Sequence, residues 1–177
     1  LEGPYSSGTG LMGDALRVQS LVPASEPYTA AGYSHMSGGG ESVPPAVFAT
    51  TGDNAIVDWV VLELRDPSIP ADVVATRSAL IQSDGDIVDA DAVSPVYLPV
   101  AAGTYHVAVH HRNHLGIMTA APLALTSTPV PLDFTLPSTP TFGTDARSDV
   151  DGTMVQWCAD VLGDGSLKYT GAGNDRD

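Results

Sequence analysis

Two Asp-rich stretches carry the residue types that bind divalent cations. The first is SDGDIVDADAVSP over residues 83–95, with four carboxylates at Asp84, Asp86, Asp89 and Asp91. On an extended strand the first two would share one face and the last two the opposite face, so only a loop brings all four together. Close carboxylates repel each other without a cation, and Asp side chains in turns also cap backbone donors. The stretch therefore predicts either a calcium site or a solvated loop of capping Asp residues.

The second stretch, ADVLGDGSLKYTGAGNDRD, occupies residues 159–177. A calcium loop needs oxygen ligands at positions 1, 3 and 5, glycine at position 6 and a carboxylate at position 12. Asp160, Asp164 and Gly165 fit positions 1, 5 and 6, but positions 3 and 12 hold no carboxylate. We expect either a calcium site with an enlarged loop or an Asp/Gly turn followed by a frayed end. In the enlarged loop, later oxygen donors close the site: Asn174, Asp175 and Asp177.

Four histidines lie close together in YHVAVHHRNH. His110 and His114 have the i, i+4 spacing of a zinc-binding helix, but the Glu of the HExxH motif is absent and the segment alternates like a strand. On a strand, His106 and His110 would lie on the outer face, and residues 111–114 would form a turn. The pattern favours polar surface residues over a transition-metal site.

Catalysis has little support in the sequence. No G-x-S-x-G nucleophile motif is present. Cys158 has no neighbouring His in the sequence, so we expect it to be a small buried hydrophobic residue and not a nucleophile. The run Gly38–Gly40 does not follow a strand in a phosphate-loop pattern. We therefore predict that the chain is not an enzyme.

Composition narrows the class of partners. The chain has 21 acidic and 7 basic residues and a formal net charge of −14, which disfavours nucleic acid and anionic membrane surfaces. Asp far outnumbers Glu, which suits a loop-rich β protein that meets divalent cations. The single cysteine excludes an intrachain disulfide. No apolar run is long enough for membrane insertion, and nothing near Leu1 resembles a signal peptide, so secretion would require a signal already removed.

Short β-rich runs between turn signals predict an all-β fold, either a sandwich or a barrel. Trp59 falls in a nearly continuous apolar run and should lie near the middle of the core. Residues 32–45 read as a long flexible loop and residues 137–151 as a linker. We expect a β-sandwich module over residues 1–143 and an Asp-rich C-terminal extension over residues 144–177. The predicted strands span residues 15–22, 45–50, 55–65, 73–82, 95–99, 104–111, 116–125, 130–136 and 153–157.

The segment LPVAAGTYHVAVHH, residues 98–111, resembles the final hairpin of prealbumin-like or collagen-adhesin B-type modules. In this chain VVLELRD, VVATRSALIQSDGD and LPVAAGTYHVAV follow in the order of those modules. The resemblance covers about a third of the chain and implies an Ig-like or prealbumin-like β-sandwich. Modules of this kind act as stalks, spacers and surface displays.

The end of the chain, WCADVLGDGSLKYTGAGNDRD, is similar to a dockerin-like segment that closes β-rich regions of large secreted Bacteroidetes proteins associated with type 9 secretion. The text from GPYSSGTGLMGDALR through HRNHLGIMTA also looks like the domain that travels with that segment. Cys158 and Leu162 depart from the usual Ala and Asn. The resemblance implies an extracellular or cell-surface location.

These observations predict an extracellular structural module stabilised by calcium. Its expected partners are other copies of itself or neighbouring domains, and head-to-tail contacts would build a filament or tube. The alternative is a carbohydrate-binding or adhesion module that meets surface glycans. Such modules usually present a strip of exposed aromatics, and Tyr28 and Tyr33 are scattered loop residues instead.

Overall fold

The computed structural model describes residues 1–158, and its largest element is a six-stranded antiparallel sheet. The strand order is β5-β4-β3-β6-β7, and β8 pairs with the start of β6. Two short hairpins, β1–β2 and β9–β10, lie outside this sheet. The strands are β1 (Tyr5–Ser6), β2 (Leu11–Met12), β3 (Ile56–Arg65), β4 (Val73–Gln82), β5 (Ile87–Val88), β6 (Gly103–His111), β7 (His114–Met118), β8 (Leu123–Leu125), β9 (Ser148–Val150) and β10 (Thr153–Val155).

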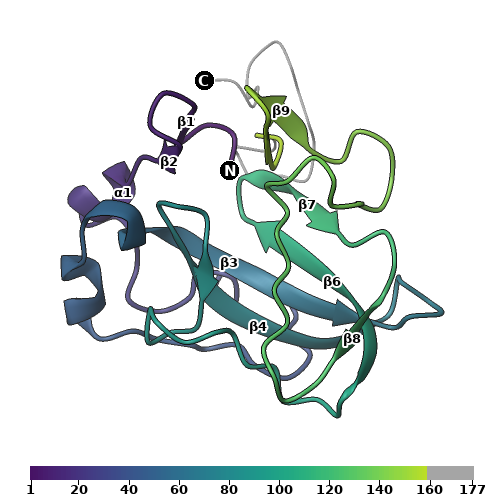
Figure 1. The fold of residues 1–177 in the computed structure, drawn as a ribbon. Helices are drawn as coiled ribbons and strands as arrows, with labels where there is room; N and C mark the ends of the chain where they lie inside the picture. Colours follow the sequence, from purple (N-terminus) through teal and green to yellow (C-terminus); the bar gives the residue numbers. More distant parts are fainter. Residues whose placement is uncertain (159–177) are drawn as a thin grey trace, which may run out of the picture.

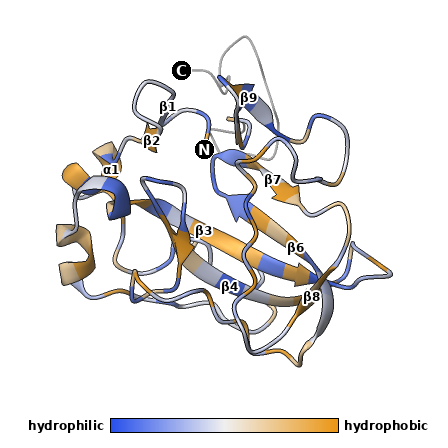
Figure 2. Cartoon of the chain, viewed as in Figure 1, coloured by the Kyte–Doolittle hydropathy of each residue, from blue (hydrophilic) through white to orange (hydrophobic). Residues whose placement is uncertain are grey.

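The centre of the sheet is β3, which pairs with β4 on one side and β6 on the other. Its sequence is rich in Val, Ile and Leu because both of its faces are covered, and all but its last residue is buried. Figure 2 shows this mostly hydrophobic strand interrupted by hydrophilic positions. Trp59 is fully buried, as predicted.

Two apolar clusters cover the two faces of the sheet. Val60 and Leu62 belong to the first cluster, with Ala79 of β4 and Val109 of β6. Trp59 and Val61 belong to the second cluster. They alternate along β3 with Val60 and Leu62, so the two pairs point to opposite faces of the sheet. The core is therefore layered on both sides of a single sheet.

Three 3₁₀ or α-helical turns flank the start of β3: α1 (Ala15–Val18), η1 (Pro45–Ala49) and η2 (Gly52–Asn54). They gather at one end of the molecule (Figure 1). The predicted strands at 15–22 and 45–50 are therefore wrong, because short apolar runs do not distinguish a strand from a buried helical turn.

The other strand predictions divide between successes and corrections. The strands predicted at 55–65, 73–82 and 104–111 are confirmed as β3, β4 and β6. The run 116–125 is split into β7 and β8, and 153–157 contains β10. The runs 95–99 and 130–136 hold no strand, although Pro95 forms an isolated bridge with Val88.

The outer edge of β7 is covered by two segments from later in the chain. Met118 accepts a hydrogen bond from the backbone N–H of Phe142, and Leu115 donates one to the carbonyl of Trp157. His114 and Cys158 form an antiparallel bridge beside the latter contact. The chain thus returns to the sheet just before residue 159.

The N-terminal segment lies beside the β9–β10 hairpin at the same end of the sheet (Figure 1). The Tyr5 hydroxyl donates to Thr153 Oγ1 over 2.9 Å, and the Glu2 carboxylate accepts from Ser148 Oγ and the Cys158 N–H. The segment read as a linker contains β9 and the buried Arg147.

The architecture over residues 1–158 is all-β: one sheet and two hairpins joined by short helical turns and irregular segments. Among residues 1–158, no helix is both long and apolar enough to cross a membrane.

Candidate functional site

The predicted Asp cluster forms the loop around β5. The Asp84 carboxylate accepts the N–H of Asp86 over 3.1 Å, and Asp91 accepts the N–H groups of Val93 and Ser94 over 3.0 and 2.8 Å. These are Asx-type turns, in which a carboxylate satisfies its own backbone. The Ser94 hydroxyl and these N–H groups lower the pKa of Asp91.

Asp89 differs from its neighbours because it has a cationic partner. Its Oδ1 lies 2.6 Å from Arg77 Nη2, and it also accepts the N–H of Ala90. Partial burial acts to raise the pKa of Asp89, but the hydrogen bonds from Arg77, Ala90 and Tyr97 together with the Arg77 charge outweigh it, and the pKa is lowered.

Within residues 1–158, no three His, Cys, Asp or Glu side chains gather in metal-binding geometry. The loop carboxylates face separate backbone and Arg partners. The remaining predicted ligands lie outside the described residues, so their arrangement stays a prediction; they are Asp160, Asp164, Asn174, Asp175 and Asp177.

The histidines lie inside the protein. His106 is buried, and its Nδ1 lies 2.9 Å from the carbonyl of Thr119, so its predicted place on an outer face is wrong. His110 is half-buried against Glu63. The prediction failed because irregular segments cover the face of β6 that carries these histidines. Irregular segments have no alternating sequence pattern, so the sequence does not show that they cover this face.

A carboxylate at the end of β3 organises the most developed polar cluster. Glu63 is 3% exposed. Its Oε2 lies 2.6 Å from Arg65 Nε and 3.1 Å from His110 Nε2, and its Oε1 accepts the Tyr33 hydroxyl. Burial acts to raise the pKa of Glu63, but hydrogen bonds from His110 and Tyr33 outweigh it and bring the pKa to about 2. The cluster therefore ties the 22–48 segment, β3 and β6 together.

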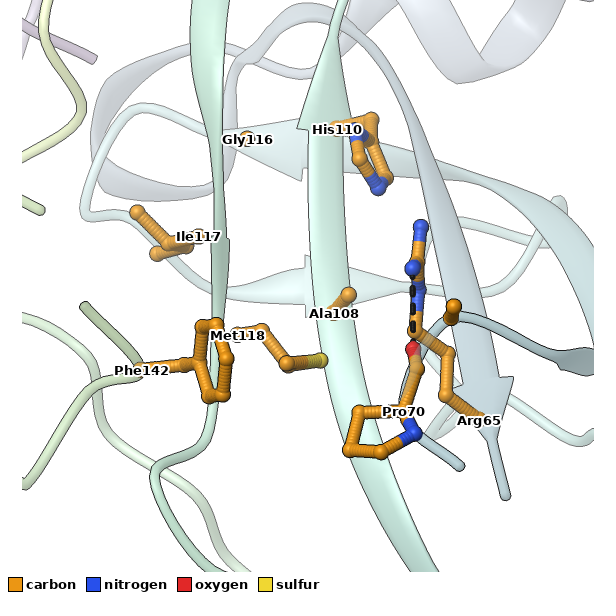
Figure 3. A pocket seen from close by; sticks show the side chains of 9 residues that line it. Arg65, Pro70, Ala108, His110, Gly116, Ile117, Met118 and Phe142 are labelled. Atoms are coloured by element: carbon orange, nitrogen blue, oxygen red, sulfur yellow. Dashed lines mark hydrogen bonds between the residues drawn. The ribbon is translucent and has the colours of Figure 1, made fainter. Parts of the chain in front are cut away.

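A shallow pocket of about 330 Å³ opens beside this cluster (Figure 3). Arg65 lies along one side and donates from Nη1 to the carbonyl of Pro70 over 3.0 Å. Met118 and Phe142 line the opposite side, and Phe142 is 56% exposed. The pocket thus combines an apolar wall with a guanidinium that Glu63 neutralises.

Gly116 supports this geometry by having no side chain. A Cβ on Gly116 would lie 2.5 Å from His110 Nδ1, closer than real Cβ contacts allow. Glycine therefore lets the imidazole lie over β7 and reach Glu63. Chemically the site holds a fixed ion cluster, and among residues 1–158 no Ser or Cys lines the pocket.

A second buried carboxylate lies near the start of β3. Asp58 Oδ2 accepts Arg112 Nη2 over 2.8 Å and lies 3.2 Å from His111 Nε2. The His111 and His114 Nδ1 atoms lie 2.9 Å apart, with their rings perpendicular in a turn, as predicted for 111–114. Burial, and after it the charge of neighbouring His111, lower the pKa of His114 to about 3.

Two glutamates, Glu26 and Glu41, accept hydrogen bonds from the glycine-rich loop over residues 38–40. Glu41 accepts the N–H of Gly39 over 3.0 Å, and Glu26 accepts that of Gly40 over 2.9 Å. Gly38, Gly39 and Gly40 all have positive φ, which glycine adopts without strain. The loop N–H groups therefore bind the protein's own carboxylates, and the region predicted as flexible is pinned to β4 through Thr76.

The two loop tyrosines, Tyr28 and Tyr33, also donate their hydroxyl hydrogen bonds to groups inside the protein. Tyr28 is buried and donates to the carbonyl of Trp59 over 2.7 Å, and Tyr33 donates to Glu63. Cys158, predicted to be buried, is exposed.

Sequence reasoning missed Asp58 and Glu63. Their signal was a carboxylate inside a strand predicted to be covered on both faces, since such a charge requires a partner.

No family model, no curated protein and no solved structure matches this chain in the comparisons made. The site is therefore interpreted from its own geometry.

Proposed function

We propose that the chain is a structural module of a secreted or surface protein that displays an Asp-rich segment from one edge of its sheet. The observation that carries this is the pairing of Trp157 and Cys158 with the edge of β7, directly before residue 159. This contact gives the following segment a fixed point of departure. The proposed location is extracellular, on the resemblance of the terminal segment.

The charge distribution supports a structural role. The carboxylates of Asp58, Glu63 and Asp89 each contact an arginine, and those of Glu26 and Glu41 hold loop N–H groups. Polar groups with this arrangement fix irregular segments to a sheet. Their carboxylates are already paired within the protein. The proposal assigns no catalysis to the chain.

The finer fold proposal is a prealbumin-like sandwich. It is supported by the succession of β3, β4 and β6, which follow the order of the resembled segments. Among residues 1–158 the strands outside the main sheet form only short hairpins, so the proposal is restricted to this succession.

Calcium is the proposed stabilising ion, with the terminal Asp segment as its first site. The test is thermal unfolding of the full chain with calcium and with chelator. An ion at a hundredfold excess over its Kd should stabilise the fold by about 2.7 kcal/mol, or roughly 5 to 10 °C in Tm. The variant Asp160→Asn/Asp164→Asn should lose the shift, while Asp84→Asn/Asp86→Asn should retain it.

The opposite pattern would move the site to the β5 loop, and no shift in any variant would remove calcium from the proposal. Self-association is tested by electron microscopy of the same samples. Filaments with calcium that disperse in chelator support head-to-tail assembly, and single particles in both conditions oppose it.

A glycan-binding role is the second candidate, and exposed Phe142 across the pocket from Arg65 favours it. Sugar rings stack on aromatic faces and hydrogen-bond to nearby polar groups. Glycan-array binding that Phe142→Ala abolishes would support this role. Retained binding in Phe142→Ala, or no binding by the unmodified chain, would oppose it.

A further inference from the structure

A second cavity is lined by residues of the main sheet, of the β9–β10 hairpin and of the N-terminal segment. Figure 1 shows the N-terminal segment and β9 near each other at one end of the molecule. Its volume is about 300 Å³. A dry cavity of about 150 Å³ already holds a benzene-sized guest, so this one has room for a longer apolar chain. Its lining includes Met12, Ile81, Val109, Phe134, Val155 and Arg147.

Arg147 is the exceptional member of this lining. It is 8% exposed, and within residues 1–158 its guanidinium donates only to backbone carbonyls. Nη1 donates to Phe134 and Leu136 over 2.5 and 3.0 Å, and Nη2 donates to Thr139 over 2.6 Å. Among residues 1–158, no carboxylate lies within salt-bridge distance of it, and its buried Nε has no hydrogen-bond partner.

Three other polar side chains of the cavity lining have hydrogen-bond partners. Ser83 donates to the carbonyl of Met12, Gln156 donates to that of Val109, and Tyr5 donates to Thr153. Arg147 Nε is therefore the polar atom of the described lining that is buried without a partner.

Two carboxylates lie in the surroundings, and neither neutralises the guanidinium. Asp84 lines the cavity from an exposed position beyond β4. Asp133 is exposed, and its Oδ1 accepts the N–H and hydroxyl of Thr135. Burial lowers the pKa of Arg147, and Asp133 offsets part of that effect through its charge.

We propose that this cavity binds a small amphipathic carboxylate, such as a medium-chain fatty acid. The carboxylate would accept a hydrogen bond from Arg147 Nε, and the hydrocarbon tail would lie among Met12, Ile81 and Phe134. The buried cation supplies the reason for the negative charge, because an unneutralised ion in an apolar site gains most from an opposite charge. The apolar walls supply the reason for the tail.

The first test varies the ligand and leaves the protein unchanged. Octanoate, 1-octanol and octylammonium share one tail and differ in charge, so calorimetric titration of each into the full chain isolates the headgroup. Octanoate should bind at least tenfold more tightly than either analogue. The ¹⁵N-detected Nε–H resonance of Arg147 should shift with octanoate and not with octanol.

Two variants complete the test. Ile87→Trp fills the cavity from β5 while leaving Arg147 in place, so it should abolish octanoate binding in a chain that stays folded by circular dichroism. Arg147→Lys keeps the charge and loses Nε, so it should weaken octanoate binding at least tenfold. If it fails to fold, the Arg147 Nε–H shift decides.

Equal binding of octanoate and octanol would overturn the proposal, because the affinity would then depend on the hydrocarbon tail and not on the carboxylate. Absence of binding by all three ligands would also overturn it and leave Arg147 as a clamp on the 134–139 turn. Octanoate binding that Ile87→Trp does not affect would place the ligand elsewhere on the molecule.

Discussion

The Asp58 carboxylate lies 2.8 Å from Arg112 Nη2 and is 1% exposed, so a full negative charge near the start of the central strand depends on a turn 54 residues later in the sequence. Burial acts to raise the pKa of Asp58, but the His111 hydrogen bond and the Arg112 charge outweigh it and lower the pKa. The pair connects the middle of the sheet to the β6–β7 turn.

Removing Arg112 should strongly destabilise the fold. Arg112→Ala leaves Asp58 buried with His111 as its remaining ionisable partner, and breaking a buried pair costs about 3 kcal/mol. Urea unfolding monitored by Trp fluorescence measures the loss. The control Asp86→Asn removes an exposed carboxylate and should change stability by less than about 0.5 kcal/mol. Equal stability of Arg112→Ala and the unmodified chain would refute a stabilising role.

Glu63 should make stability depend on pH in the acid range. Its pKa is about 2 in the folded chain against an ordinary value of 4.5. Its contribution is therefore complete above about pH 4.5 and is lost as the pH falls toward 2, with a total of about 3 kcal/mol. Glu63→Gln should flatten the slope of unfolding free energy over that range.

Other carboxylates with lowered pKa values also contribute to acid unfolding, so the measurement is the difference between Glu63→Gln and the unmodified chain. Asp53→Asn, at an exposed position, should keep the unmodified slope. Parallel curves for Glu63→Gln and the unmodified chain would contradict the assigned pKa.

Gly116 should tolerate no side chain. In Gly116→Ala the new Cβ meets the His110 ring and displaces it from Glu63, at a cost of about 1 to 3 kcal/mol. Gly3→Ala is the matched control, because a Cβ there meets nothing within 4 Å. Thermal unfolding of both variants checks the prediction, which fails if the two have the same Tm.

Glu26 should hold the glycine-rich loop in place locally. Its carboxylate accepts the N–H groups of Tyr28, Thr29 and Gly40. In Glu26→Gln, hydrogen exchange at these three amides should accelerate at least tenfold, because the neutral amide is a weaker acceptor. Amides of β3 should remain protected, and a uniform acceleration across both regions would instead indicate global destabilisation.

The sequence predicted the centre of the fold better than its covering layers. The run containing Trp59 was long, apolar and β-branched, so β3 and its neighbour β4 followed from it. The segments at 15–22 and 45–50 are also apolar, but they form helical turns from which Leu16, Val47 and Phe48 pack against the second core cluster. Local patterns carry no information about that packing.

The candidate site was harder to predict because its parts come from distant positions. Tyr33, Glu63 and His110 meet across three segments, and none of the three forms a motif with its sequence neighbours. Clusters of Asp attracted attention because they are contiguous, yet within residues 83–95 their oxygens serve local turns. Only the buried position of a charge inside β3 signalled the long-range partnerships.

The coverage of β7 by Phe142, Trp157 and Cys158 has a consequence for solubility. A long unpaired strand edge templates cross-chain pairing and amyloid-like growth. Here the chain's own later segments occupy part of one such edge, and Met36 pairs with Thr76 at the edge of β4. At these positions, a second copy could pair with the backbone of the sheet only after the chain's own segments had been displaced.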